Sequence, residues 1–325
     1  MKTKRVFLIN PFNSAVLLAV LLFFLIASPA VAADKISGYK SIFHVCRDEA
    51  GNLQLAIRQF ILDGVTYLLL VNPRSLQTSI VPASTTTSAS AGEADAAAHS
   101  PFSTALERLT AQPRLQNAGL THGESSKNGL FLSVDLCPSK KPFEREMFTV
   151  VADLAGKTGG PVPVAVAITG YWLAHHQGEM EWLKGEMAGG RLAITWVNHS
   201  HSHPYDPKKP FNLNFLLTPT VDFEQEVLST EMALLENGLL PSIFFRFPGL
   251  VADGRLLKKL RQLSLIPVGS DAWLAKGETP TNGSIVLVHG NGNEPQGIRK
   301  LLPLLRSDNP PRLLPLQDAV AGSAP

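Results

Sequence analysis

Residues 192–204 read LAITWVNHSHSHP, and they decide both the fold of this chain and the place of its chemistry. The short, continuous apolar run at residues 192–197 predicts a buried strand. Three histidines, His199, His201 and His203, follow the strand at once. In folds built from parallel strands, the loops at the carboxyl ends converge on one mouth, so this cluster predicts a functional site.

Two arrangements of the histidines are compatible with the sequence. In a helical turn, His199 and His203 lie on the same side, which is a usual spacing for two imidazoles that bind one divalent metal. In an extended segment, His199, His201 and His203 share a face, and Pro204 disfavours a helical conformation at His203. A polar surface loop that binds no ligand is the remaining interpretation.

The alternation of strand and helix continues on both sides of this stretch. Apolar runs separated by amphipathic helices predict parallel strands that are covered by helices. We therefore predict an α/β protein with a barrel or distorted (β/α) barrel, although the sequence contains no internal repeat. Further strands are expected at residues 129–134, 163–168, 242–245, 265–268 and 285–288, and helices at 179–187, 222–237, 254–263 and from Glu294 onward.

Polar side chains with catalytic potential follow four of these strands. Asp135 suits a base, a metal ligand or a cap of the next turn. Arg246 suits a residue that stabilises an ionised carboxylate, or one that pairs with a structural acid. Asp271 follows the strand at residues 265–268, and His289 suits either a catalyst or a core histidine. With the histidine cluster, reactive groups stand at five of the six predicted strand ends of the barrel.

The N-terminus predicts a secretory signal peptide. A basic head precedes an apolar run at residues 15–27, and Ala30, Val31 and Ala32 offer a small-residue cleavage site. At about 13 residues, the run is shorter than the roughly 20 that a transmembrane helix needs. We therefore expect cleavage near Ala32, removal of residues 1–32, and a secreted or periplasmic protein without a stable membrane span.

The charge of the chain argues against nucleic acid and other polyanions as partners. The 325 residues hold 29 basic and 27 acidic side chains, but three of the basic ones lie in residues 1–32, which contain no acid. The rest of the chain has 26 basic and 27 acidic residues, a net charge of −1. Proteins that hold phosphate backbones cluster lysine and arginine instead. A content of 45% hydrophobic residues is enough for one large core and a small additional unit.

Residues 34–82 predict a small β-rich unit ahead of the barrel. Apolar runs at residues 53–62 and 65–71 are separated by Asp63-Gly64, the strongest short signal for a β-hairpin. A further extended stretch follows at residues 79–82.

Residues 83–100 differ in composition from both neighbours. They are rich in Ser, Thr, Ala and Gly, and hold too little apolar surface to offset the entropy of ordering. This composition predicts a linker or a disordered loop, with the barrel domain at residues 101–325.

The two cysteines, Cys46 and Cys137, are too few for a disulfide scaffold. One bridge between them is possible in an oxidising compartment. Cys137 lies two residues beyond Asp135, so it suits a role in the site equally well.

The order of these motifs resembles the NodB-type polysaccharide deacetylases, carbohydrate esterase family 4. That family adopts a distorted (β/α) barrel and removes acetyl groups from polysaccharides with a divalent metal. The resemblance spans residues 128–306 and is most specific at the second motif, His-Ser/Thr-x-x-His-Pro, which residues 199–204 match completely. The first motif corresponds to residues 133–138, the third to 246–249, the fourth loosely to Asp271 and Trp273, and the fifth to 287–289.

The resemblance implies a hydrolase that acts on a non-peptide carbon–nitrogen bond of an N-acetylated glycan. Asp135 corresponds to the general base that acts on a metal-activated water, and His199 and His203 correspond to metal ligands. Arg246 corresponds to the residue that orients this base.

The remaining matched residues lie around the scissile bond in the family. His289 corresponds to the acid that protonates the leaving amine, and Asp271 to the group that tunes it. The backbone N–H of Gly249 corresponds to a donor to the oxyanion, and Trp273 to a substrate contact.

The first motif departs from the family at one metal ligand. The family's second aspartate is Leu136 here, and leucine cannot bind a cation. Asp135 itself, His201 or Cys137 can supply the missing ligand, and a Cys137 thiolate favours zinc. Two other functions are compatible with the same residues: a catalytically decayed glycan-binding module, and hydrolysis of another amide or ester on the same barrel.

Overall fold

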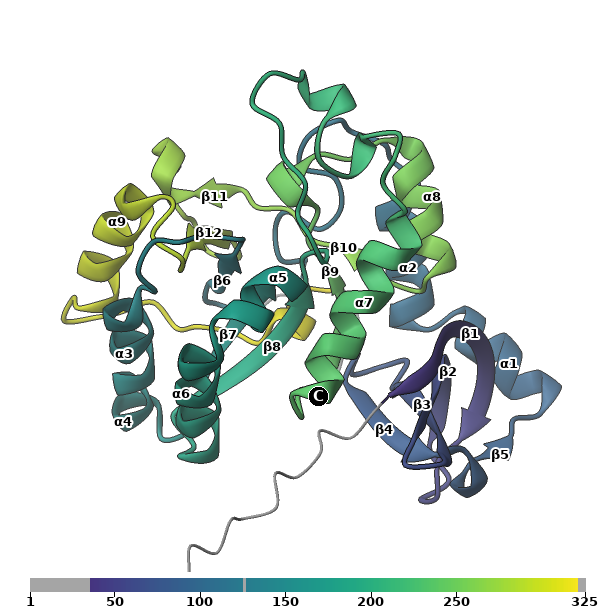
Figure 1. Cartoon of the computed structure of the whole chain (residues 1–325). Helices are drawn as coiled ribbons and strands as arrows, with labels where there is room; N and C mark the ends of the chain where they lie inside the picture. The colour runs from purple at the N-terminus through teal and green to yellow at the C-terminus, as the bar shows by residue number, and fades with distance from the viewer. Residues whose placement is uncertain (1–35, 125–126, 321–325) are drawn as a thin grey trace, which may run out of the picture. The chain divides into compact units, whose positions relative to one another are not determined.

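Two β-sheets organise the chain (Figure 1). Within residues 36–124 and 127–320, which are the residues that the structure describes, this computed structural model holds an antiparallel sheet of five strands and a parallel sheet of seven. The predicted fold class is confirmed, because a curled β/α sheet follows a separate β-rich unit. The predicted signal peptide, residues 1–32, lies outside the described residues.

The antiparallel sheet contains the predicted hairpin. Its strands are β1 (Ser37–Arg47), β2 (Leu53–Leu62), β3 (Val65–Val71), β4 (Thr78–Pro82) and β5 (Thr87–Ser88), in the order β4-β3-β2-β1-β5. Strands β2 and β3 pair across Asp63 and Gly64. Both turn residues have positive φ, 50° and 78°, as a two-residue turn of this kind requires.

The predicted linker at residues 83–100 is wrong, because this segment forms secondary structure against the β-rich unit. It contains the 3₁₀ turn η1 (Ala83–Thr85), strand β5, which pairs with β1, and helix α1 (Ala91–Ala98). Alanine, the best helix former, dominates α1, and Ser90 and Glu93 close a capping box at its start. Helix α2 (Pro101–Thr110) follows directly. Local helix propensity and capping therefore order a segment that hydrophobicity alone would not.

The parallel sheet contains every strand predicted for the barrel, with bounds shifted by two residues at most. Its strands are β6 (Phe131–Leu136), β7 (Val162–Ile168), β8 (Leu192–Asn198), β9 (Pro241–Phe245), β10 (Ile266–Pro267), β11 (Ala272–Trp273) and β12 (Ile285–His289). The order is β10-β9-β8-β7-β6-β12-β11, and every neighbouring pair is parallel. Strand β11 was not predicted.

Helices surround the parallel sheet (Figure 1). They are α3 (Arg145–Asp153), α4 (Ala155–Thr158), α5 (Gly170–His175), α6 (Gln177–Ala188), α7 (Phe223–Glu236), α8 (Gly254–Gln262) and α9 (Pro295–Leu305). Four short 3₁₀ turns lie between them in the chain, and a fifth follows α9: η2 (Phe211–Leu213), η3 (Phe215–Leu217), η4 (Pro248–Leu250) and η5 (Leu274–Lys276), then η6 (Leu316–Ala319). Helices α6 to α9 correspond to the four predicted helices. Among the described helices, none has the length and apolar character needed to cross a membrane.

The connection between β10 and β11 shows that the sheet is curled. These strands form opposite edges of the sheet, yet only residues 268–271 separate them along the chain. A connection of this length spans at most about 18 Å, far less than the width of a flat sheet of this size. In addition, Arg246, which follows β9, donates hydrogen bonds to Ser133 and Asp135 on β6, although β8 and β7 lie between these strands in the sheet. The two edges therefore approach each other and enclose an interior.

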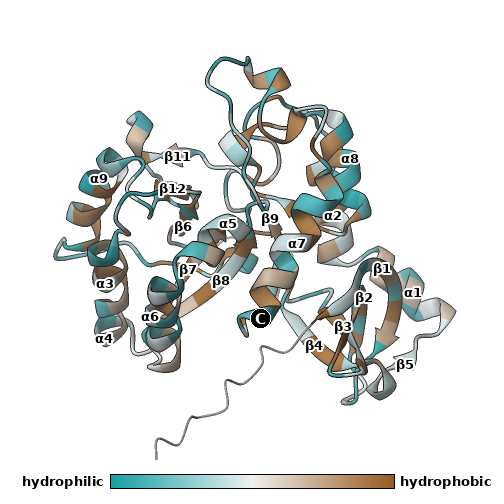
Figure 2. Cartoon of the chain, viewed as in Figure 1, coloured by the Kyte–Doolittle hydropathy of each residue, from teal (hydrophilic) through white to brown (hydrophobic). Residues whose placement is uncertain are grey.

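Side chains along the strands alternate between this interior and the helices. Leu132, Val134 and Leu136 pack in the core beneath the helices, whereas Ser133 and Asp135 face the interior. Figure 2 shows the corresponding pattern of hydropathy, with brown strands such as β8 and with brown and teal on different sides of α8. The alternation decides which residues near a strand end can reach the mouth.

A buried ion pair fastens the β-rich unit to the barrel. Arg58 of β2 and Glu231 of α7 are fully buried, and the guanidinium donates to both carboxylate oxygens, at 2.7 and 2.9 Å. Arg58 also donates to the carbonyl oxygen of Leu263, and the Tyr39 hydroxyl donates to Glu231 at 2.9 Å. Burial and the charge of Glu231 raise the pKa of Tyr39 well above its usual value. Each charge in this interface thus has partners, as burial demands.

Candidate active site

The register of the parallel sheet brings Asp135 and His289 together. They are direct partners on the adjacent strands β6 and β12, at the carboxyl ends of both. Asp135 lies within its strand rather than after it and is buried. Two of the predicted catalytic residues therefore meet at the mouth of the curled sheet.

The histidine segment adopts neither of the two arrangements considered from the sequence. Ser200 and His203 have left-handed backbones, with φ of 66° and 49°, so the segment is neither a helical turn nor extended. It brings the rings of His199 and His203 to 4.9 Å from each other. His201 turns away toward Gly170, where its Nδ1 would lie 2.0 Å from a Cβ added to the glycine. The missing ligand does not come from His201 in this geometry.

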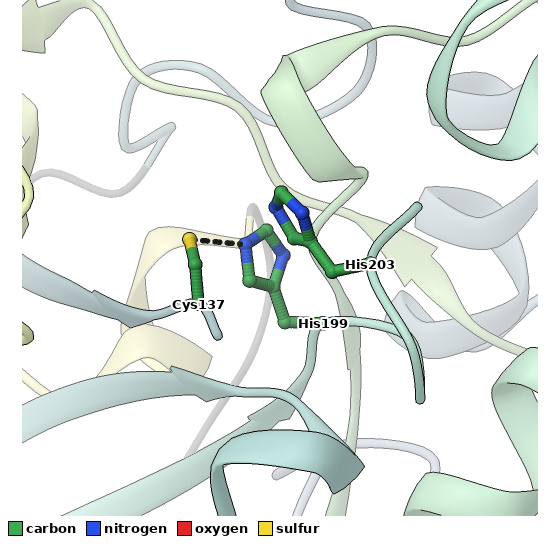
Figure 3. A group of neighbouring side chains, drawn as sticks. All are labelled: Cys137, His199 and His203. Carbon is green, nitrogen blue, oxygen red and sulfur yellow. Dashed lines mark hydrogen bonds between the residues drawn. The ribbon is translucent and has the colours of Figure 1, made fainter. Parts of the chain in front are cut away.

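Cys137 completes a group of three metal-binding side chains with His199 and His203 (Figure 3). One ligand atom from each of the three lies within 4.8 Å of the others, and the Cys137 Sγ is 3.4 Å from Nε2 of His199. Strand alternation explains the choice of residue, because positions 135 and 137 face the mouth while Leu136 faces the core. The Cys137 thiol therefore lies in the mouth of the sheet, which a side chain at position 136 cannot reach.

Hydrogen bonds around His199 favour metal binding through its Nε2. Its Nδ1 lies 2.8 Å from the backbone carbonyl oxygen of Arg246, so Nδ1 carries the proton and donates it. The lone pair of Nε2 then points toward Cys137. A carbonyl that fixes the tautomer in this way is a regular feature of histidine ligands. Burial lowers the pKa of His199, which also favours the neutral ring.

Asp135 is held by Arg246 next to this group. The guanidinium Nη1 donates to Oδ1 of Asp135 at 3.1 Å, and Nη2 donates to Ser133 and to the carbonyl oxygen of Gly269. Oδ2 of Asp135 lies 3.7 Å from Nε2 of His199. Both partners of the Arg246–Asp135 pair are buried, so the carboxylate is fixed in orientation and kept near the histidine.

The acid that contacts His289 is Glu294, not Asp271. An oxygen of Glu294 lies 2.9 Å from Nδ1 of His289 and accepts a hydrogen bond from the Trp273 indole at 2.6 Å. Burial lowers the pKa of His289, but the neighbouring Cys137 and Glu294 outweigh burial and raise it well above its usual value. The histidine at the mouth therefore favours its protonated form.

The prediction that Asp271 tunes His289 is wrong, because Asp271 lies at the other end of the strands. It precedes β11, and its carboxylate accepts from the backbone N–H of Ile285, the first residue of β12, at 2.9 Å. It also pairs with His122 at 2.6 Å. His289 is the last residue of β12, about 13 Å further along the strand. The two-residue strand β11 was not recognised in the sequence, so Asp271 was assigned to the wrong edge.

Gly249 lies at the mouth in a conformation that suits glycine, with φ of 62°. A Cβ at this position would lie 2.4 Å from the ring of Phe215. Phe215 therefore occupies the space beside Gly249 that a side chain would need.

These residues line one pocket of about 590 Å³, within the range of small-molecule sites. Asp135, Cys137, His199, His203 and His289 lie on its inner wall, with Arg246 behind Asp135. Gly249, Trp273, Glu294, Tyr205, Phe211, Phe215 and Gln116 are among the residues around them.

The two cysteines do not form a bridge. Both are free, and Cys46 is buried among apolar residues of the β-rich unit. Burial raises the pKa of the Cys137 thiol, but the nearby His203 and His289 outweigh burial and lower it to about 7. Cys137 is therefore surrounded by imidazoles rather than by a second sulfur.

Two further acids contact residues of the site, and neither was identified as a site residue from the sequence. Glu294 was noted only as the start of a helix, and Glu226 of α7 was not noted at all. Glu226 accepts from the backbone N–H groups of His201 and Ser202, at 2.8 Å each, and so holds the histidine segment. The signal for Glu294 was its position five residues after His289, in the loop that leaves the mouth.

Comparison with known proteins gives a match for the β-rich unit. A family model described as the RP012 protein N-terminal domain matches residues 37–96. The match spans the five strands of the antiparallel sheet and most of α1, and so continues through the segment that was predicted to be a linker.

Solved structures similar to this chain include family 4 carbohydrate esterases. One from Bacillus anthracis is 19% identical, with 68% of this chain and 92% of that chain covered and a TM-score of 0.47. PdaA from Bacillus subtilis, also a family 4 carbohydrate esterase, is 16% identical over 62% of this chain and 82% of that chain, with a TM-score of 0.43. A CE4 family pseudoenzyme from Bacillus anthracis is 14% identical over 59% and 65% of the two chains, with a TM-score of 0.40.

Proposed function

We propose that this chain is a secreted or periplasmic, zinc-dependent hydrolase that removes acetyl groups from an N-acetylated polysaccharide or oligosaccharide. The observation that carries the proposal is the meeting of Cys137, His199 and His203 in one pocket with Asp135 and His289. Metal ligands, a fixed carboxylate and a histidine are the groups that hydrolysis of an amide requires.

The donor set fits zinc better than a harder cation. One thiolate and two imidazoles are soft or borderline ligands, and three protein ligands leave a fourth position open, as in catalytic zinc sites. The Nδ1 proton of His199 is already engaged by the Arg246 carbonyl, so no rearrangement is needed to present Nε2. When bound by these residues, zinc would acidify a water and polarise the acyl carbonyl.

Asp135 is suited to the role of general base. Its Oδ1 is occupied by Arg246, while Oδ2 faces His199 and the pocket. The carboxylate can therefore accept a proton from the attacking water on the side of the ligands. Arg246 acts through Asp135, because it fixes the orientation of the carboxylate and favours its ionised form.

His289 is suited to the role of general acid. Glu294 lies 2.9 Å from Nδ1, which leaves Nε2 as the nitrogen that can donate a proton to the leaving amine. Trp273 holds Glu294 in turn. We assign the backbone N–H of Gly249 as a donor to the oxyanion, a role that requires no side chain.

Metal analysis and acetate release test the proposal together. We expect about one zinc per purified chain, as a site with three protein ligands predicts. Chitooligosaccharides, peptidoglycan and poly-N-acetylglucosamine are the substrates to assay, with and without a chelator. Cys137→Ser should lose zinc and activity, whereas Cys46→Ser, which alters a buried thiol outside the pocket, should retain both.

Three results would contradict the proposal in different ways. Activity that survives both chelation and Asp135→Asn excludes the mechanism. Sugar binding without acetate release and without zinc indicates a decayed glycan-binding module. Activity that survives chelation but is lost in Cys137→Ser assigns the thiol as a nucleophile instead of a ligand.

A further inference from the structure

An aromatic wall lines part of the pocket. It is formed by Tyr205, Phe211 and Phe215, which belong to the connection from β8 to α7 that extends beyond the strand ends (Figure 1). The rings of Tyr205 and Phe215 are stacked, with centroids 5.1 Å apart and an interplanar angle of 22°. Phe215 in turn meets the ring of His203 edge-on, at 5.9 Å. The wall therefore begins directly beside a proposed zinc ligand.

The wall is held rigidly, although Tyr205 is 59% exposed. Asn214 is buried and its side chain makes four hydrogen bonds across the connection: it accepts from the N–H groups of Asp206 and Phe215, and donates to the carbonyl oxygens of Asp206 and Lys209. Phe215 itself has a left-handed backbone, with φ of 50°, which Asn214 stabilises. A large exposed ring on a fixed support loses little entropy when it binds a ligand.

The surroundings of the wall suit a sugar ring better than a wholly apolar group. A pyranose has apolar C–H faces that stack on aromatic rings, and a hydroxyl edge that needs hydrogen-bond partners. Gln116 and the Tyr205 hydroxyl offer such partners in the same pocket. An aliphatic chain would leave these polar groups unpaired, which costs binding free energy.

We propose that the exposed ring of Tyr205, supported from behind by the buried ring of Phe215, forms a stacking subsite for a sugar ring next to the residue whose acetyl group is removed. This inference rests on the function proposed above and specifies how the glycan is held. Phe215 also fills the space at Gly249, so the ring that supports Tyr205 is itself packed against the backbone of residue 249. The substrate is then an oligosaccharide or polysaccharide with at least two rings in the pocket, not a single acetylated sugar.

Binding to an inactive variant tests the subsite. Isothermal titration of tetra-N-acetylchitotetraose, and separately of a peptidoglycan disaccharide, into the full chain with Asp135→Asn gives the reference affinity. Adding Tyr205→Ala should weaken the affinity by about three- to tenfold, the value of one aromatic stacking contact. Tyr205→Phe keeps the ring and loses only the hydroxyl, so it should weaken the affinity less than Tyr205→Ala. Tyr171→Ala is the matched control, because Tyr171 is 51% exposed and stacked on His175 but lines a different pocket.

The outcomes separate this inference from the function on which it rests. If Tyr205→Ala weakens binding and the unmodified protein releases no acetate, the subsite stands and the hydrolase proposal fails. If acetate is released but Tyr205→Ala binds as tightly as Tyr171→Ala, the subsite is overturned. Absence of binding for both sugars also overturns it. Equal melting temperatures of the two alanine variants exclude unfolding as the cause of a loss.

Discussion

Replacing Glu231 by alanine tests how strongly the β-rich unit is fastened to the barrel. The carboxylate accepts two hydrogen bonds from Arg58 and one from Tyr39, and it is fully buried together with Arg58. Alanine would leave the guanidinium charged in a dry environment. Its remaining partners would be the carbonyl oxygens of Ile57 and Leu263.

The expected loss follows from the contacts that disappear. Two hydrogen bonds between charged groups contribute about 1.5–3 kcal/mol each, which gives about 3–6 kcal/mol. Breaking a buried ion pair from one side typically costs about 3–5 kcal/mol, in agreement with that range. A double variant, Arg58→Met with Glu231→Leu, removes the unpaired charge, so it should be clearly more stable than Glu231→Ala.

Urea unfolding followed by circular dichroism measures these free energies. Glu146→Ala is the matched control, because Glu146 pairs with Arg306 on an exposed surface and should contribute about 0–1 kcal/mol. If Glu231→Ala loses no more stability than Glu146→Ala, the buried pair does not hold the interface. If Arg58→Met with Glu231→Leu is less stable than Glu231→Ala, the unpaired charge of Arg58 is not the cause of the loss.

Three further predictions concern the site and the pH dependence of folding. Glu294→Gln should lower kcat at least about tenfold because it weakens general-acid catalysis, whereas Asp271→Asn should leave kcat within about twofold; equal effects in an acetate-release assay would contradict the assignment. Gly249→Ala should reduce the free energy of unfolding in urea by about 1–3 kcal/mol, because its methyl group would overlap the ring of Phe215, and Phe215→Ala in the same chain should restore part of the loss. The raised pKa of Tyr39 means that the folded protein keeps a proton that the unfolded chain releases, so stability should fall as pH rises above about 10, and Tyr39→Phe should flatten that fall in urea titrations at several pH values.

Most of the fold was predictable because its signals are local. Apolar runs and helix periodicity lie within short windows, and the Asp63-Gly64 turn needs only two residues. The exceptions are short or atypical elements. Strand β11 has two residues and leaves no periodic pattern, and α1 is ordered by alanine content and a capping box rather than by an apolar face.

The site was predictable in part, because strand ends reveal which residues reach an edge but not which residues touch. Asp135, His199, His203 and His289 all line the pocket. Strand alternation was available in the sequence and favours Cys137 over position 136, whereas the choice of Glu294 over Asp271 depended on recognising β11. The aromatic wall depends on the hydrogen bonds of Asn214 and on the fit of a ring over a glycine. No periodic pattern encodes such contacts.

Helix α7 gives the β-rich unit a means of acting on the chemistry from a distance. Glu231 engages Arg58 at one point of the helix, and Glu226, about 7.5 Å along the same axis, engages the histidine segment. Both contacts belong to helix α7, so we expect a displacement at Glu231 to shift Glu226 and the histidine segment as well. We therefore expect substitutions in the β-rich unit to alter the proposed activity without any contact with substrate, so a search for variants of altered activity should sample both halves of the chain.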